Sequence, residues 1–301
     1  MTAGERAEVI TELRQVFNKS LHFVLKVVGM SHSSYYYVVK PKAKKEDDAP
    51  IIQAIDEIRL TDSKYTRKYG YRRITDKLHE QGFVVNHKRV LRIMTEHGWL
   101  SHYYGRGQRK YNSYKGTVGR VAKNRLHRRF VTDRPYQKLV TDVSEFRYGT
   151  MTQAERIYLE PVLDLFSGEV LAYSISDHPT VDFALKPLRE ALEGLPTLPY
   201  RTTVHTDQGF QYQHKHWQRV LKNHHVFQSM SRKATCLDNA EMESFFGVMK
   251  AEVMDEHYGT KWELEAAMRE WLEFYNLRRV KGRLKGKSPV EYRKLALQNA
   301  A

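Results

Sequence analysis

Residues 203–250 read TVHTDQGFQYQHKHWQRVLKNHHVFQSMSRKATCLDNAEMESFFGVMK, and this stretch decides which fold the sequence predicts. It opens with a β-branched run that ends at Asp207 in a Gly-containing turn, as a strand does at the edge of a sheet. It closes in a helical pattern. At about 100° per residue, Glu243 flanks the apolar stripe on the same side as Asn239 and Lys250. This arrangement predicts that the glutamate looks across the sheet edge at which Asp207 stands.

A third carboxylate fits the same geometry. Asp142 ends the alternating run Lys138–Thr141, which is a strand pattern. Two strand-end aspartates and a helix glutamate can form the oxygen-only site that Mg²⁺ prefers. Two such ions, about 3.5–4 Å apart, would activate a nucleophile and stabilise the leaving oxygen of a phosphodiester. Any one of these acids, taken alone, is better interpreted as a solvated surface residue, so the metal-binding interpretation depends on the surrounding motifs.

Those motifs carry a resemblance to a known family. Asp142 in TDVSEF, Asp207 in HTDQGFQY and Glu243 in DNAEMESFFGVMK resemble the DDE triad of retroviral-integrase-like transposases, with the usual 35 residues between the last two acids. The motifs VLDLFSGEVLAYSIS, SMSRKATCLDNA, YNLRRVKGRL and KSPVEY extend the likeness over residues 136–293. They are typical of second-reading-frame transposases of the insertion-sequence-three family, although Ser144 stands where Thr is more usual. The resemblance implies catalytic and metal-binding roles for the three acids, with two Mg²⁺ ions per site and Mn²⁺ as a substitute.

The order of patterns after residue 135 indicates an α/β catalytic core. We expect strands at 138–142, 156–163, 169–176, 202–206 and 226–229, and helices at 180–193, 213–223 and 238–255. Three strands followed by alternating helix and strand favour a mixed sheet with helices on both faces. The resemblance implies the ribonuclease-H-like fold for residues 135–258. A capping box at Thr260–Glu263 begins a last long helix, which with a basic tail completes the core over residues 259–301.

Length and composition exclude several classes of protein. A chain of 301 residues with 41% hydrophobic and 12% aromatic residues can bury a catalytic core and one or two small domains. Cys236 is the single cysteine, which excludes a disulfide framework or Cys-rich zinc module and fits a reducing compartment. The sequence has neither 18 consecutive apolar residues nor a signal-peptide core. These features predict a cytoplasmic protein with no membrane partner, and the resemblance implies that it is bacterial.

The positive charge is concentrated ahead of the predicted core. Residues 1–135 carry 28 Lys and Arg against 13 acids, whereas residues 136–301 carry 22 of each. A basic linker over residues 105–134 interleaves tyrosines with cations, a pattern that favours nucleic-acid contact over a merely solvated linker. The cations expected to contact DNA there are Arg106, Arg109 and Lys110.

Two all-α segments are expected before this linker. Residues 1–41 and 46–104 each read as helices joined by Gly-containing turns, which is a helix-turn-helix outline. The second segment ends in a helix between an Asn86 cap and Gly98, with Val90, Ile93, Met94 and His97 on one face. Lys88, Arg89 and Arg92 share the opposite face, as a helix lying on DNA requires. An ordinary amphipathic helix with a basic exposed side is the alternative. The resemblance adds a helix-turn-helix domain ahead of the core.

Several further residues are candidates for a functional or a structural role. Lys250 points the same way as Glu243 and is expected to hold a DNA phosphate, as the family's cation at that offset implies. Arg278 and Arg279 either contact DNA or form structural ion pairs. Asp164 is expected to cap a turn rather than bind metal, and His205 either orients a ligand or is a satisfied buried histidine. His214 and His216 read as surface residues.

These features together predict a transposase that cleaves the 3′ ends of an insertion sequence and joins them to new DNA. Its expected partners are double-stranded DNA (terminal inverted repeats and target), further copies of the chain on that DNA, and the upstream-frame product. Two alternatives stay open: a non-catalytic helix-turn-helix regulator, and a hydrolytic nuclease of the same fold.

The cation excess predicts that affinity for double-stranded DNA falls steeply with salt, because each neutralised phosphate releases condensed counterions. Fluorescence anisotropy over a series of KCl concentrations checks this, and the plot of log Kd against log salt should be steep and linear. A nearly flat plot would contradict the role given to the basic linker.

Overall fold

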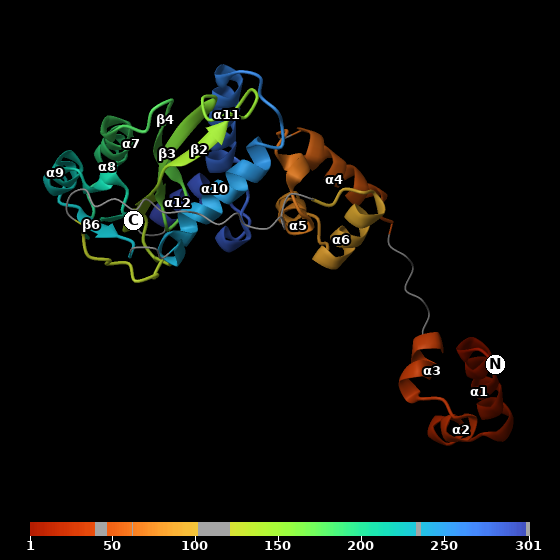
Figure 1. Cartoon of the computed structure of the whole chain (residues 1–301). Coiled ribbons are helices and arrows are strands. Elements are labelled where there is room, and N and C mark those ends of the chain that lie inside the picture. The colour runs from red at the N-terminus through yellow and green to blue at the C-terminus, as the bar shows by residue number, and fades with distance from the viewer. Residues whose placement is uncertain (40–46, 62, 102–120, 233–235, 299–301) are drawn as a thin grey trace. The chain divides into compact units, whose positions relative to one another are not determined.

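A computed structural model describes residues 1–39, 47–61, 63–101, 121–232 and 236–298 (Figure 1). The chain forms two compact units, residues 1–50 and residues 51–301. Arg106, Arg109 and Lys110, which are expected to contact DNA, lie outside the described residues.

The first unit is built from three short helices: α1 (Ala3–Phe17), α2 (Leu21–Val28) and α3 (His32–Val39). A capping box of Thr2 and Glu5 begins α1, and Gly29 ends α2 with a φ of 68° that favours glycine. Its small core contains Ala7, Ile10, Val24, Leu25, Met30 and Tyr35. The helices and the break at Gly29 confirm the helical outline predicted for this segment.

The second unit begins with α4 (Ala49–Thr61), the 3₁₀ turn η1 (Thr66–Lys68), α5 (Tyr71–Glu80) and α6 (His87–Glu96). Asn86 caps α6 by accepting a hydrogen bond from the Lys88 N–H at 2.9 Å. Val90, Ile93 and Met94 are fully buried on its inner face, as predicted. The prediction for His97 was wrong: the helix stops at Glu96, and the exposed His97 ring instead stacks on Trp99 at 4.6 Å.

A mixed sheet forms the centre of the second unit. Its strands are β1 (Lys138–Thr141), β2 (Ser144–Arg147), β3 (Arg156–Asp164), β4 (Val170–Ser176), β5 (Thr203–Thr206) and β6 (Phe227–Met230). β1, β5 and β6 run parallel, and β3 is antiparallel to its neighbours β1, β2 and β4. The short strand β2 was not predicted, because polar and charged residues follow Asp142 without a clear alternation.

Helices cover both faces of this sheet (Figure 1). Leu139 and Val204 pack on one face against α7 (Val181–Glu193), α8 (Phe210–Gln213) and α9 (Lys215–Asn223). Val140 faces the other way, toward α10 (Ala240–Val253) and α11 (Lys261–Leu277). The remaining elements are η2 (Cys236–Asn239), η3 (Gly282–Leu284) and α12 (Pro289–Gln298). This is the predicted ribonuclease-H-like architecture. Over the described residues, no helix is both long and apolar enough to cross a bilayer.

The helix-turn-helix segment α4–α6 is docked on the C-terminal half of the core. Its apolar residues belong to the same buried cluster as those of α10 and α11. Lys68 donates to the backbone oxygen of Glu252 at 2.7 Å, and the Tyr65 hydroxyl donates to Ala267 O at 3.1 Å. The Glu252 carboxylate is itself buried and accepts hydrogen bonds from Arg279 and from Trp271 Nε1. Glu252 therefore contacts the helix-turn-helix segment through its backbone oxygen and, at 3.7 Å from Arg73, through its carboxylate.

Replacing Glu252 by Gln should lower the free energy of unfolding by about 3–5 kcal/mol, because it leaves the buried Arg279 guanidinium without its counter-charge. Urea denaturation followed by tryptophan fluorescence measures the change. The matched control is Glu265→Gln, which breaks a half-exposed pair with Arg269 on one helix and should cost no more than about 0.5 kcal/mol. Equal, small effects of both substitutions would contradict the role given to Glu252.

Candidate active site

Strands β1 and β5 bring two of the predicted acids together. They are parallel neighbours with Val140 opposite His205. Asp142 and Asp207 each stand two residues further along, so the same register places them opposite one another where the strands end. Neighbouring strands lie about 4.8 Å apart, which puts the two carboxylates on the same sheet edge and within reach of a shared cation.

The surroundings of the two aspartates disfavour negative charge. Burial raises the pKa of Asp142 well above its ordinary value, and the nearby charges of Asp207 and Glu160 raise it further. Burial also raises the pKa of Asp207. Asp142 accepts hydrogen bonds from Val143 N and from Asn239 Nδ2, both at 2.8 Å, and Asp207 accepts one from Gly209 N at 2.7 Å. Two crowded carboxylates with fixed orientations are a site that gains from a bound cation.

Glu243 shares a flank of α10 with Asn239. It stands one helical turn beyond Asn239, whose amide contacts Asp142. The Lys250 ammonium, two turns further on, lies 5.1 Å from the Phe146 ring centroid. Burial lowers the pKa of Lys250, while the charges of Glu145 and Asp142 partly restore it. Glu243 itself is exposed, and in the described part of the chain no three His, Cys, Asp or Glu side chains already form a metal-binding group.

A fourth carboxylate, Glu160, lies on the neighbouring strand β3. Glu160 on β3 is fully buried and accepts hydrogen bonds from Thr141 Oγ1 at 2.6 Å and the Tyr212 hydroxyl at 2.9 Å. Burial raises its pKa to about 8. Sequence reasoning missed this residue, although an acid inside the apolar run IYLEPVLD was an available signal. Glu160 supports the strand end that carries Asp142 through its bond to the neighbouring Thr141.

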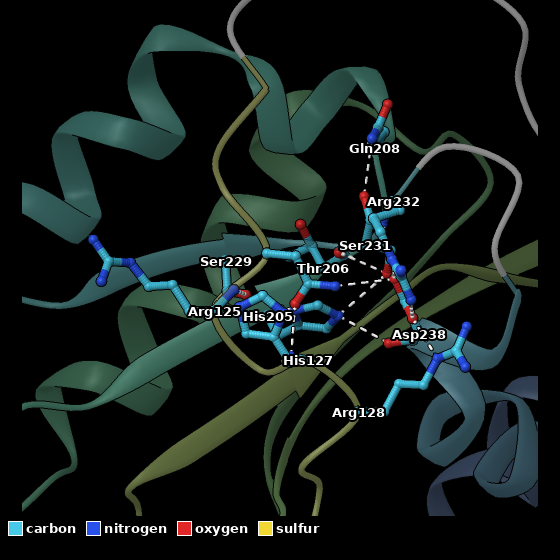
Figure 2. A network of polar contacts seen from close by, with 11 residues as sticks. Arg125, His127, Arg128, His205, Thr206, Gln208, Ser229, Ser231, Arg232 and Asp238 are labelled. Carbon is cyan, nitrogen blue, oxygen red and sulfur yellow. Dashed lines mark hydrogen bonds and ion pairs between the residues drawn. The ribbon is translucent and has the colours of Figure 1, made fainter.

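The start of α10 is fixed by a clasp around Asp238, which we define as Asn124, Arg128, Arg232 and Asp238. Figure 2 shows Arg128, Arg232 and Asp238. The Asp238 side chain is 1% exposed and accepts hydrogen bonds from Asn124 Nδ2, Arg128 Nε and both Nε and Nη2 of Arg232, at 2.9–3.0 Å. The bonds from Arg232, followed by that from Arg128, hold the pKa of Asp238 well below its usual range. The clasp joins the end of β6 to the residue before Asn239, and so sets where α10 begins relative to Asp142.

His205 of β5 belongs to the same network (Figure 2). It is buried on the strand face that it shares with Asp207, and burial lowers its pKa. The neutral ring has its Nε2 2.9 Å from Asp238 O and its Nδ1 2.8 Å from Ser229 Oγ. Of the two predicted readings, a satisfied buried histidine is the one that these contacts support.

Three family models match the chain. An integrase core domain matches residues 132–236, an HTH-like domain residues 45–107, and a second integrase core model residues 243–297. A protein of Escherichia coli (strain K12), assigned as transposase InsK of insertion sequence element IS150, is 40% identical over 289 residues, which cover 95% of this chain and 97% of that relative. The chain belongs to the insertion-sequence transposases.

Two further proteins are similar to this transposase. Transposase InsF of insertion sequence IS3A from Escherichia coli (strain K12) is 30% identical over 280 residues, covering 91% of this transposase and 93% of InsF. Among solved structures, the catalytic core domain of HTLV-2 integrase in complex with magnesium is 19% identical, with a TM-score of 0.41 over 53% of this transposase and 97% of that chain.

Asp164, His214 and His216 of the transposase have the roles that the sequence predicts. Asp164 caps its turn as expected, accepting hydrogen bonds from Tyr136 N and from the Ser167 hydroxyl. His214 and His216 are exposed at the start of α9, again as expected.

The DNA-binding candidates of the transposase divide into two groups. Lys88 is exposed on α6, and Arg89 and Arg92 are partly exposed beside it, with Arg92 bound to Glu96 at 3.0 Å. Arg278 is also partly exposed, with its guanidinium 5.7 Å from the Phe274 ring. Arg279 requires a correction: it is 2% exposed and paired with Glu252 at 2.6 Å, so its guanidinium forms a structural ion pair and is not offered to DNA.

The clasp yields a pH-dependent prediction. Asp238→Asn should lower the free energy of unfolding at neutral pH by about 2–4 kcal/mol, because charged hydrogen bonds to two arginines are lost. Because the folded pKa of Asp238 is depressed, its contribution is complete above the ordinary Asp pKa of about 4 and is lost as pH falls toward the folded value. Urea unfolding at several pH values should therefore show the two proteins converging below about pH 4.

The control for this measurement is Asp133→Asn, since the Asp133 side chain is 82% exposed and lies 3.8 Å from Arg134. It should leave stability nearly unchanged at every pH. A wild-type advantage over Asp238→Asn that stays constant through the acid range would show that the charge of Asp238 does not stabilise the fold.

Proposed function

We propose that this transposase cleaves DNA at the ends of an insertion sequence and joins the released 3′ ends to a new site. The observation that carries the proposal is the placement of Asp142 and Asp207 opposite one another at adjacent strand ends, with the Asn239–Glu243 flank of α10 beside them. The match to integrase core models over both halves of the site supports it.

The residues at this site fit a divalent metal of the hard type. The donors of Asp142, Asp207 and Glu243 are carboxylate oxygens. Burial raises the pKa values of the two aspartates, and a bound cation would favour their charged forms. We assign these three acids to the metal, with Mg²⁺ as the natural ion, Mn²⁺ as a substitute and two ions per site. When bound, the metal supplies positive charge that activates the attacking oxygen and stabilises the leaving one.

The reaction consists of two exchanges at phosphorus. Water attacks the phosphodiester at the element end, the P–O3′ bond breaks, and the departing oxygen takes up a proton as a free 3′-OH. That hydroxyl then attacks a target phosphodiester, loses its proton to solvent and displaces the target 3′ oxygen. One ester bond forms as one breaks in the joining step, so positioning is the main task of the protein.

The chain's own residues serve that positioning. Asn239 donates to Oδ2 of Asp142 and Val143 N donates to Oδ1, so the two bonds fix the orientation of the carboxylate. Lys250 is placed to hold a DNA phosphate next to the scissile bond, because its ammonium lies on the Glu243 flank. Lys88, Arg89, Arg92 and Arg278 are assigned to phosphates and base edges further along the duplex.

We further propose the partners and setting of the reaction. The DNA comprises the terminal inverted repeats of the element and a target duplex, and two or more copies of the transposase assemble on it. The upstream-frame product of the same element supplies additional end recognition. The reaction takes place in the bacterial cytoplasm, on nucleoid DNA.

Asp142→Asn, Asp207→Asn and Glu243→Gln should each reduce strand cleavage and joining by about 10³-fold or more, since each removes a ligand charge at the reacting phosphate. DNA affinity should stay within about threefold of the unmodified protein, because none of the three lies on α6, which we assign as the recognition helix. Gel assays with a labelled terminal repeat in Mg²⁺ measure both quantities.

The same assay separates the alternatives. Normal joining by any of the three variants would sink the catalytic assignment. Nicks without joined products would identify a hydrolytic nuclease, and an unmodified protein that leaves DNA intact in both Mg²⁺ and Mn²⁺ would identify a non-catalytic regulator.

A further inference from the structure

A cavity lined in part by cations lies on the far flank of α10. It has a volume of about 320 Å³ and is lined in part by Glu241, Ser244 and Val248 of that helix. At about 100° per residue these three lie roughly 100–160° round the helix from Glu243. The cavity is therefore separated from the candidate active site by the body of α10.

Cations from two parts of the second unit line this cavity. Arg73 comes from α5 of the helix-turn-helix segment, whereas Arg279, Lys281 and Arg283 come from the segment that follows α11. Two of these groups converge closely. A Cβ atom built on Gly168, whose φ is 71°, would lie 2.6 Å from Arg283 Nη2 and 2.8 Å from Lys281 Nζ. Only a residue without a side chain leaves room for both cations at this point.

The carboxylates at the cavity pair with its arginines, and Arg73 lies 3.7 Å from Glu252. Arg279 is already paired with Glu252, and Arg283 lies 3.3 Å from Glu241. Lys281 donates to the Tyr275 hydroxyl at 2.6 Å, and within the described ranges no carboxylate lies at ion-pair distance from its ammonium. Burial, followed by the charges of Arg283, Arg279 and Arg73, lowers the pKa of Lys281 well below its ordinary value. Converging cations of this kind are relieved by an anion.

We propose that this cavity binds a backbone phosphate of the DNA at the junction between the helix-turn-helix segment and the catalytic core. Phosphate oxygens suit both the guanidinium of Arg283 and the point charge of Lys281. A bound phosphate bridges groups from both parts, so it fixes the path of the duplex between the recognition helix and the active site. The inference rests on the proposal that the transposase acts on DNA.

The test uses the full-length transposase in EDTA and a fluorescent duplex that carries one terminal repeat, taken from the DNA flanking the coding sequence. Lys281→Gln and Arg283→Gln should each weaken binding about tenfold at low salt and reduce the slope of log Kd against log salt by about 1. Arg283→Gln is included because its side chain is 47% exposed and its loss should not impair folding. The matched control, Lys285→Asn, removes an exposed cation from the same segment at a φ of 56° that Asn tolerates, and should change neither quantity.

A second arm measures the melting temperature in inorganic phosphate against chloride at constant ionic strength. Phosphate should raise the melting temperature of the unmodified protein more than that of Lys281→Gln. Unchanged DNA affinity and salt slope in both cavity variants would overturn the proposal. If, in that case, phosphate still raised the melting temperature of the unmodified protein alone, the cavity would be a site for a free anion and not for DNA. Equal losses of DNA affinity in all three variants would also overturn the proposal, because they would show an effect of net charge alone. Because no chemistry occurs in EDTA, these outcomes are independent of whether the three acids are catalytic.

Discussion

Helix α10 is held near both ends by buried carboxylates, and the candidate active site and the cation-lined cavity both depend on its position. Asp238, just before the helix, is bound by arginines from the end of β6 and from the segment before the sheet. Glu252, near its other end, is bound by Arg279 and lies against the helix-turn-helix segment. A helix fixed in this way cannot slide or rotate without breaking several charged hydrogen bonds. The flank that carries Glu243 therefore keeps its place beside Asp142, and the opposite flank keeps its place beside the cation-lined cavity.

The sheet contributes the other half of the candidate site, at a cost to stability. Parallel pairing of β1 with β5 forces two aspartates to the same edge, where burial and mutual repulsion disfavour their charged forms. Such an arrangement works against folding and is retained where function requires it. The apolar layers on both faces of the sheet supply the stability that offsets this cost.

Much of this architecture could be predicted from local sequence patterns, because strands and helices each have a characteristic period. Asp142, Asp207 and the Asn86 cap stand at pattern boundaries, and the structure places them there. The features that escaped prediction depend on partners distant in sequence. Glu160 becomes informative only when Thr141 and Tyr212 close around it, and Arg279 reads as a surface cation until Glu252, 27 residues away, is seen to bind it. The acidic triad is only half assembled in this structure: the two aspartates are adjacent, and the catalytic role of all three stays a prediction.

The contacts that dock the helix-turn-helix segment join residues far apart in the chain: Lys68 bonds to Glu252, 184 residues later, and Tyr69 to Val280, 211 residues later. A ribosome synthesises the chain from its N-terminus, so α4–α6 emerge long before the surface that receives them exists. The recognition helix is consequently available to DNA, or to a chaperone, while translation of the rest continues. The docking of α4–α6 on the catalytic core is therefore a property of the finished polypeptide, and a product truncated before α10 would lack it.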